Sequence, residues 1–418
     1  MLTEPTSRPA LPDAPGRAMA PDLARGLMLL LIVISNTGFH LWGARHGESG
    51  WHPIDVSPVD AVAQFVMITA LDFRAYPLFA LLVGYGIAQM ARRRRATGST
   101  AGQVRVLLLR RGLGLLVIGF VHAALLLAGD ILGVYAIAGT VLGLIFLNRR
   151  APTKLVAALA FFTLLTLTSV LSITEALAGR FPPPAVPSVV LYATGETSWL
   201  ASIPLRLETW AGVTIGGALL GLSFFVAILL GFWAAERGVL DRPGDHLRLL
   251  RVVAGAGITI GWLGGLPSAL AQGGLIEVPP GWMIELGPLF SLQSVTGLPA
   301  GLGYAAAFAL LAHRLSTGTH PAWVDTCTAT LVSTGRRSLT CYVGMSVLFA
   351  PVLAAWGLGL GDQLGSASAV LFAIAVWLIM VCVCAALARA GRQGPAEALL
   401  RRITYGPDGA APMRRWTV

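Results

Sequence analysis

Ten stretches of this 418-residue chain are each apolar for about 20 residues, the length that an α-helix needs to cross a lipid bilayer. Inside a bilayer the backbone finds no water to bond with, so such stretches are expected to form helices. The chain is also 55% hydrophobic and only 12% charged, which excludes an ordinary soluble domain. We therefore predict an all-α polytopic membrane helix bundle of about ten transmembrane helices, at residues 26–44, 70–90, 107–128, 131–148, 155–178, 211–235, 252–271, 285–312, 338–356 and 367–388.

The basic residues fall on one side of this arrangement. If the N-terminus is cytoplasmic, 26 of the 30 Lys and Arg residues lie in cytoplasmic segments, and only Arg45, Arg74, Arg180 and Arg206 lie outside. The positive-inside rule then predicts that both termini are cytoplasmic and that the protein is a multi-pass protein of the bacterial plasma (inner) membrane. The net charge of +10 reflects orientation and contact with anionic membrane lipids. We expect no nucleic-acid partner.

Composition along the chain predicts five segments. The first is a Pro-rich cytoplasmic leader that lacks the apolar core of a signal peptide. The five segments are a disordered leader 1–21, an N-terminal bundle 22–235 with an external loop 179–210, a cytoplasmic hinge 236–251, a C-terminal bundle 252–390 and an amphipathic cytoplasmic tail 391–418.

The four cysteines lie in or near the last apolar segments and are interpreted as small buried hydrophobes, so no metal is expected.

Polar residues at membrane depth are costly and are therefore the first candidates for function. In the first span, Asn36 follows Arg25 by three helical turns, a rise of roughly 16 Å, and His40 lies one turn further. One helical stripe would thus carry a cation, an amide and an imidazole. The alternative is a snorkelling arginine, an interhelical hydrogen bond and an interfacial histidine.

A histidine and an aspartate flank the turn between the third and fourth spans. In "GFVHAALLLAGDIL", His122 lies near the outer end of one span, and Gly129 and Asp130 form the turn into the next. A carboxylate beside an imidazole is the arrangement that a general base needs. The alternative is that Asp130 caps the following helix and that His122 is a core histidine.

Two further groups are candidates for binding. Asp72 and Arg74 open the second span, where we expect an ion pair on a substrate path. At the inner end of the ninth span, "TGRRSLTCY" places Arg336, Arg337 and Ser338 together, and such a group can hold a phosphate by charge and hydroxyl donors. An ordinary positive-inside flank explains the same residues equally well.

These motifs carry a resemblance to a known family. "LARG" followed by Asn36, "RAYPLFALLVGYG", "RRGLGLLVIGFVHAALLLAGDIL", "GRRSLTCY" and "GPAEALLRRITYG" resemble the YeiB family of bacterial inner-membrane proteins, a domain of unknown function numbered 418. They extend from about residue 22 to 406. The family is similar in fold to a wider group of transmembrane acyltransferases, which take an acyl group from acyl-CoA inside and pass it to an acceptor on the far side.

The resemblance implies acyl-CoA or acetyl-CoA as co-substrate and an extracytoplasmic sugar, lipid or small molecule as acceptor. It also implies that Arg25, Arg336, Arg337 and Ser338 face the CoA phosphates. Acyltransferase-3 proteins carry a histidine where this chain has Asn36, so His40 or His122 would have to serve as the base. Cys341 stands where relatives tend to have asparagine.

Other classes of function remain open on the sequence. A proton-coupled transporter or flippase would use His122, Asp130, Asp72 and Arg74 as a proton or substrate path without covalent chemistry. A membrane scaffold would use the same residues only for packing. The sequence does not decide between a monomer and a homodimer.

Overall fold

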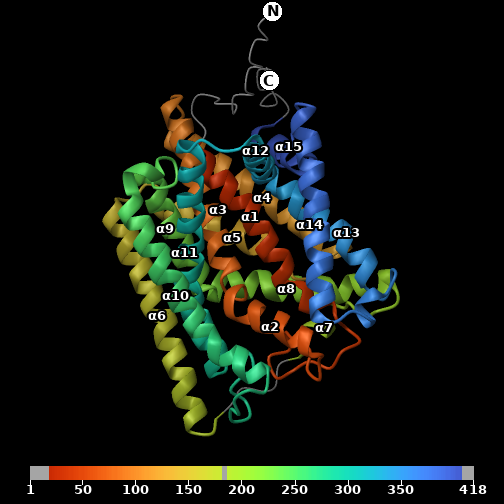
Figure 1. Cartoon of the computed structure of the whole chain (residues 1–418). Coiled ribbons are helices and arrows are strands. Elements are labelled where there is room, and N and C mark those ends of the chain that lie inside the picture. Colours follow the sequence, from red (N-terminus) through yellow and green to blue (C-terminus); the bar gives the residue numbers. More distant parts are fainter. Residues whose placement is uncertain (1–17, 181–185, 407–418) are drawn as a thin grey trace, which may run out of the picture.

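The computed structural model describes residues 18–180 and 186–406, and within these ranges it is an all-helical bundle (Figure 1). The described residues form no strand and contain one isolated bridge, between His46 and Pro53. The helices are α1 (Met19–Ser35), η1 (Thr37–His40), α2 (Pro58–Ala70), α3 (Ala75–Ala96), α4 (Ala101–Leu125), α5 (Leu132–Phe146), α6 (Ala151–Leu177), α7 (Ser188–Leu191), α8 (Trp199–Leu220), α9 (Leu222–Arg237), η2 (Pro243–His246), α10 (Leu247–Gln272), α11 (Pro288–Thr317), α12 (Ala322–Arg336), α13 (Ser338–Leu353), η3 (Leu360–Asp362), α14 (Ser366–Arg389) and α15 (Pro395–Tyr405).

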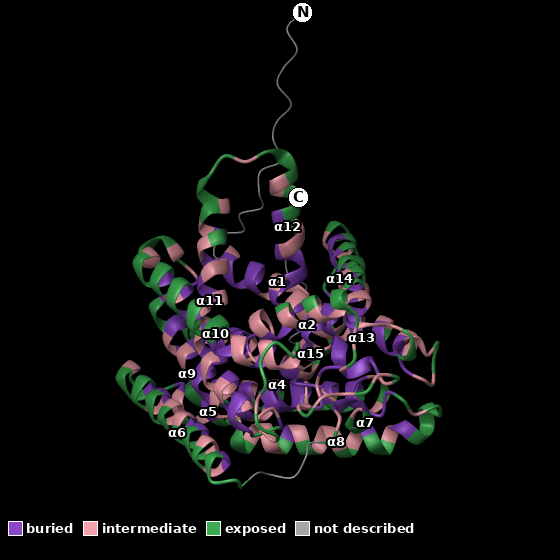
Figure 2. Ribbon diagram, turned by 60° about the horizontal axis from the view of Figure 1, so that its bottom comes forward, coloured by how far each residue is buried: buried purple, intermediate pink, exposed green. Residues whose placement is uncertain are grey.

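Several of these helices have the length and composition of membrane spans. Among the described residues, five helical segments are both long enough and apolar enough to cross a membrane. The bent pair of α8 and α9 would make a sixth if the two helices form one span. The five are Pro58–Ala96, Ala151–Leu177, Pro243–Gln272, Pro288–Thr317 and Ser366–Arg389. Of these, α6 lies on the outside of the bundle and is largely exposed (Figure 2), with only 17% of its most apolar window buried. The exposed side chains include several leucines and valines. Such a surface is suited to lipid.

The bundle has two distinct ends. In Figure 1, α12 and α15 lie at the top, while α2, α7 and α8 lie at the bottom. We refer to these as the α15 end and the α7 end. Helix α1 runs between them and packs against α11, α12 and α14, which come from the predicted C-terminal bundle. Of the predicted segments, residues 1–17 of the leader, 181–185 of the loop and 407–418 of the tail lie outside the described residues.

The predicted second span is interrupted near its start. An unpredicted helix, α2, precedes it, and the chain breaks at residues 71–74, where Phe73 has a left-handed φ of 62°. Such a conformation is uncommon for a bulky residue and needs support from its surroundings. Glycines of α10 and α11 give that support, because a Cβ at Gly297 would collide with the Phe73 carbonyl and a Cβ at Gly265 with the Arg74 guanidinium.

The predicted span at 211–235 falls on two helices that meet at an angle. Helix α8 begins inside the predicted external loop, lies across the α7 end and meets α9 at a 62° bend (Figure 1). The bend falls at Gly221, where a Cβ would collide with the Gly217 carbonyl. Only glycine tolerates this turn, so two shorter helices replace one span.

Close helix packing depends on glycines at the contacts. Gly84 of α3 is one example, because a Cβ there would collide with the Ile228 carbonyl of α9. In the same way, α1 and α12 meet through Gly26 and Gly335, whose Cβ atoms would strike the Leu331 and Asp22 carbonyls. Small residues let helices approach until van der Waals contacts hold them together in an apolar solvent.

We expect Gly84→Ala to destabilise the protein by about 1–3 kcal/mol, because the added methyl group overpacks the contact between α3 and α9. Gly255→Ala is the matched control, since nothing lies within 4 Å of a Cβ at that position in α10. The control should be neutral or stabilising by up to about 1 kcal/mol. Thermal unfolding of both variants in the same detergent measures the difference, and equal midpoints would contradict this packing role.

Candidate active site and a second polar cavity

The Asp130 carboxylate joins three elements of the bundle. It lies in the turn between α4 and α5 and is fully buried. Its Oδ1 accepts hydrogen bonds from Nδ1 of His122, at 2.9 Å, and from the Tyr342 hydroxyl of α13, at 3.3 Å. Its Oδ2 accepts from the Gly133 N–H in the first turn of α5, at 3.2 Å. The aspartate therefore caps the helix and orients the histidine at the same time, so the two interpretations of the sequence coexist.

The other side of the His122 ring is free. Its Nε2 is buried and has no hydrogen-bond partner in the described structure, while the Tyr342 ring packs against the imidazole at 5.1 Å between centroids. Because Nδ1–H donates to Asp130, the neutral ring carries its lone pair on Nε2. Gly119 lets the turn approach α4, since a Cβ there would lie 2.5 Å from Asp130 Oδ2. The predicted pair thus has the geometry of an oriented base.

Asn36 and His40 line one cavity together with Tyr342. Helix α1 ends at Ser35, and residues 37–40 form a 3-10 turn, so the predicted helical stripe does not continue to His40. Both side chains nevertheless face the same cavity between α1 and α13, which we call the first cavity. His40 is buried, its Nδ1 is unpartnered, and its ring packs edge-on against Phe349. His122 stands behind Tyr342 and is not among the residues that line this cavity.

The predicted arginine group lies at the α15 end. Arg25 and Arg336 both bind the buried Asp22 carboxylate, at 3.2 and 3.3 Å. Arg337 instead donates to the backbone carbonyls of Arg392 and Ser333, and Ser338 begins α13 half-buried. Two of the four predicted phosphate ligands therefore share one carboxylate, about 16 Å along α1 from Asn36.

Asp72 and Arg74 point to different partners, so their predicted ion pair is wrong. The Arg74 guanidinium donates to the Asp72 backbone carbonyl, to Gln293 Oε1 at 3.0 Å and to the Gly261 carbonyl at 2.6 Å. The left-handed turn at Phe73 reverses the chain between the two residues, which separates their side chains.

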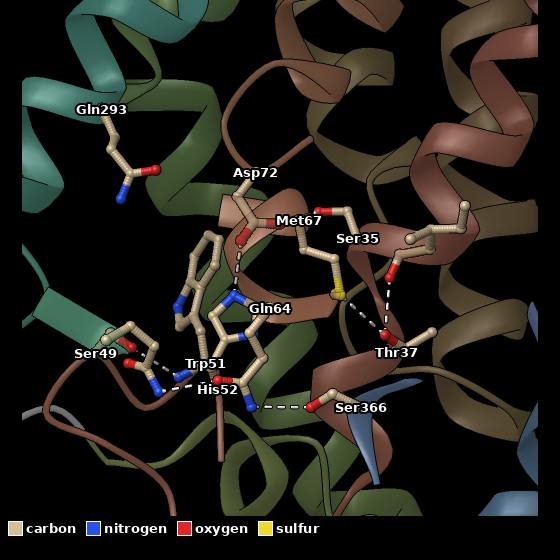
Figure 3. Close-up of polar contacts among 12 residues, drawn as sticks. Ser35, Thr37, Ser49, Trp51, His52, Gln64, Met67, Asp72, Gln293 and Ser366 are labelled. Carbon is tan, nitrogen blue, oxygen red and sulfur yellow. Dashed lines mark hydrogen bonds and ion pairs between the residues drawn. The ribbon is translucent and has the colours of Figure 1, made fainter. Parts of the chain in front are cut away.

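A second buried histidine–aspartate pair was missed from the sequence. Asp72 accepts from His52 Nε2 at 2.7 Å and from the Ser35 hydroxyl at 2.8 Å (Figure 3). His52 lies in a loop, 20 residues before Asp72, and no helical or strand spacing connects the two. The one available signal was that the acid lies where an apolar span begins.

Burial lowers the pKa of His46, which lies in the same loop as His52, and this favours the neutral form of His46.

Among residues 18–180 and 186–406, no group of three or more His, Cys, Asp or Glu side chains is placed to hold a metal ion. Three buried carboxylates, those of Asp22, Asp72 and Asp130, each bind two or more donors.

The fold and its apolar helices define a helical protein of the membrane type. Residues 234–407 match the profile of the family described as "Protein of unknown function (DUF418)". The chain is also 25% identical over 404 residues to the "Uncharacterized protein YxaH" of Bacillus subtilis (strain 168), covering 92% of this chain and 93% of that protein. Both similarities agree with the resemblance seen in the motifs of the chain.

We expect Asp130→Ala to cost about 1–3 kcal/mol for each buried donor left without an acceptor. Asp130→Asn should cost less, because an amide oxygen still accepts. Asp245→Ala is the control, since that carboxylate is exposed and should change stability by less than about 0.5 kcal/mol. Unfolding in mixed micelles measures all three, and an Asp130→Ala variant as stable as the control would show that the pair is not coupled to folding.

Proposed function

We propose that this protein is an inner-membrane acyltransferase that moves an acyl group from cytoplasmic acyl-CoA to an extracytoplasmic sugar, lipid or small-molecule acceptor. The observation that carries the proposal is His122, whose Nδ1 is held by Asp130 and whose Nε2 is buried without a partner. An imidazole oriented by a carboxylate and free at its second nitrogen is suited to take a proton from a hydroxyl or amine. The family resemblance supplies the class of reaction by analogy.

The proposed reaction gives each residue a role. His122 Nε2 takes the acceptor proton, the acceptor oxygen or nitrogen attacks the thioester carbon, and the carbon–sulfur bond breaks as the CoA thiolate leaves. The imidazolium, stabilised by Asp130, then returns the proton to the thiolate. Asn36 donates a hydrogen bond to the thioester oxygen in the tetrahedral intermediate. His40, on the same cavity, is the alternative base.

Charge and helix direction support the binding of CoA at the α15 end. Arg25 and Arg336 converge there on Asp22, and CoA phosphates would compete for the same guanidinium groups. The pantetheine arm would follow α1, between α4 and α13, toward Asn36. In this proposal Arg337 and Ser338 contribute less, because Arg337 already donates to backbone carbonyls.

The proposed topology makes the α15 end cytoplasmic. We propose ten spans with both termini inside, in which the shorter apolar helices α5 and α13 also cross the bilayer. The support is the distribution of basic residues, 26 of 30 on one side. The ion pair between the buried Lys154 and the exposed Glu236 would then lie near the inner surface.

Topology can be tested by reporter fusions at two sites. A fusion after Arg95 should report a cytoplasmic location, because "RRRR" at 92–95 precedes it. A fusion near Tyr192 should report the opposite side. A periplasm-active phosphatase and a cytoplasm-active fluorescent protein at each site provide matched readouts, and identical locations for the two sites would refute the topology.

Acetyl-CoA binding tests the arginine group. We expect Arg25→Ala or Arg336→Ala to weaken binding by about 1.5–3 kcal/mol, the scale of a hydrogen bond to a charged group. Arg314→Ala, which removes an exposed cation elsewhere on the cytoplasmic side of the proposed topology, should leave binding unchanged. Calorimetry on the three variants makes the comparison, and equal affinities would leave Arg25 and Arg336 as orientation signals.

Turnover tests the base. We expect His122→Ala to abolish acyl transfer while the protein still inserts and binds acetyl-CoA, and Asp130→Asn to lose activity less completely. His313→Ala is the control, because that histidine lies near the C-terminal end of α11 and does not line the first cavity. Full activity in His122→Ala together with its loss in His40→Ala would move the base to η1.

A proton-coupled transporter is the second candidate, and the helix breaks favour it. Discontinuous helices with polar residues at the break often form the binding sites of transporters. Here α2 and α3 break beside Asp72 and Arg74, and α8 and α9 bend at Gly221. If substitutions of His122 and Asp72 leave acyl transfer unaffected but block solute movement into vesicles, the transporter is the better account.

A further inference from the structure

Arg111 of α4 is a half-buried cation to which the proposed reaction gives no role. Its guanidinium group makes no hydrogen bond and no ion pair with any of the described residues. Two other arginines of the same helix, Arg105 and Arg110, are exposed. An orientation signal needs only a charge in water, as these two provide. Burying part of a guanidinium group costs free energy unless something binds it, so Arg111 is a candidate ligand for an anion.

Helix α15 covers the side of α4 on which Arg111 lies. The two helices pack together at the α15 end (Figure 1). Arg111 and Gly114 are three residues apart, so they share one face of α4. A Cβ at Gly114 would lie 2.9 Å from Leu400 Cδ1 and 3.2 Å from Ile403 Cγ2. The apolar face of α15 therefore crosses α4 within one turn of Arg111.

Three ionisable groups lie close enough to Arg111 to interact with it electrostatically, namely Tyr405, Arg25 and Glu397. Arg25 brings a second cation from α1, and two neighbouring cations attract an anion. Tyr405 is held in place by Arg94 of α3, whose guanidinium carbon lies 4.4 Å from the centre of the Tyr405 ring. The half-buried Tyr405 hydroxyl has no hydrogen bond to a described residue and can donate one.

The nearby carboxylates are bound to other donors. Glu397 Oε1 accepts from the N–H groups of Leu339, at 2.7 Å, and of Thr340, at 3.1 Å, while its Oε2 accepts from the Thr340 hydroxyl. Glu397 thus caps the N-terminus of α13. Asp22 is bound by two other arginines. Neither carboxylate forms an ion pair with Arg111, so its charge is available to an anion from outside the chain.

The donors favour a phosphate group over a carboxylate. A carboxylate has two oxygen atoms, and a single guanidinium group can bind both. Here Arg111, Arg25 and Tyr405 come from α4, α1 and α15, so the donors belong to three different helices. A phosphate group has enough oxygen atoms to accept from all three, and arginine suits it because its planar fork binds two oxygens at once.

We propose that Arg111, together with Arg25 and the Tyr405 hydroxyl, binds a phosphate group where α15 crosses α4. The phosphate belongs either to a soluble ligand or to the headgroup of an anionic lipid. The site stands whether or not the chain transfers acyl groups. Only the assignment of this phosphate to acyl-CoA rests on the proposed function.

The experiment has two arms, both on the full-length protein in a phosphate-free maltoside detergent. Calorimetric titration with inorganic pyrophosphate tests the soluble source, and thermal unfolding with added phosphatidylglycerol tests the lipid source. We expect Arg111→Gln to weaken binding by about tenfold to a hundredfold, the loss of a hydrogen bond to a charged group. Tyr405→Phe keeps the ring under Arg94 and should weaken binding by up to about tenfold. Arg110→Gln is the matched control, because it removes the same charge from the adjacent, exposed position.

Thermal unfolding without phosphate separates binding from packing. Arg111→Gln should unfold at the temperature of the wild type, because Arg111 makes no hydrogen bond to a described residue. Binding that depends on Arg111 in either arm supports the site, and the arm identifies the source of the phosphate. The proposal is overturned if neither probe binds, if Arg111→Gln behaves like the wild type in both arms, or if Arg110→Gln weakens binding equally. Because no acyl-CoA is present, pyrophosphate binding through Arg111 in a protein that does not bind acetyl-CoA would refute the acyltransferase proposal alone.

Discussion

The Arg74 guanidinium is buried where two apolar helices break, and much of the α7 end is arranged around it. Its Nη atoms donate to the Asp72 carbonyl, to Gln293 of α11 and to the Gly261 carbonyl of α10. A cation in an apolar bundle is stable only with such partners. Satisfying it fixes the break at residues 71–74, and the break in turn directs Asp72 and Phe73 toward a small cavity that they line together with Trp51 and His52.

Three buried aspartates, at different places in the bundle, each bind several hydrogen-bond donors. Asp22 binds two arginines, Asp72 binds a histidine and a serine, and Asp130 binds a histidine, a tyrosine and a helix N-terminus. Each carboxylate joins elements that are distant in the chain. Because an unpaired charge would be expensive there, these contacts fix both the packing and the orientation of the histidines. On the two histidines that these aspartates hold, His122 Nε2 and His52 Nδ1 stay without a hydrogen-bond partner within the described residues and are available for chemistry or binding.

Local patterns predicted much of the helical architecture and one part of the candidate site. Each predicted apolar stretch is mainly helical, as an apolar chain in a membrane must be, although the stretches at 26–44, 70–90 and 211–235 each contain a break. His122 and Asp130 were predicted as a pair because a tight turn forces the ends of two helices together. The bend at Gly221 was missed because the mean hydropathy of a stretch of sequence does not depend on the direction in which the helix runs. His52 was missed because its contact with Asp72 depends on the path of a loop, which no periodicity records.

The claim that His122 is an oriented base can be tested most directly by ¹⁵N NMR of histidine-labelled protein, with the His122 signals assigned by difference from His122→Gln. The account predicts a ring with its proton on Nδ1, bonded to Asp130, and an unprotonated Nε2. Asp130→Asn should shift this signal, while Asp245→Asn should not. A ring with its proton on Nε2, or one protonated on both nitrogens, would contradict the account, because neither could accept a proton from an acceptor group.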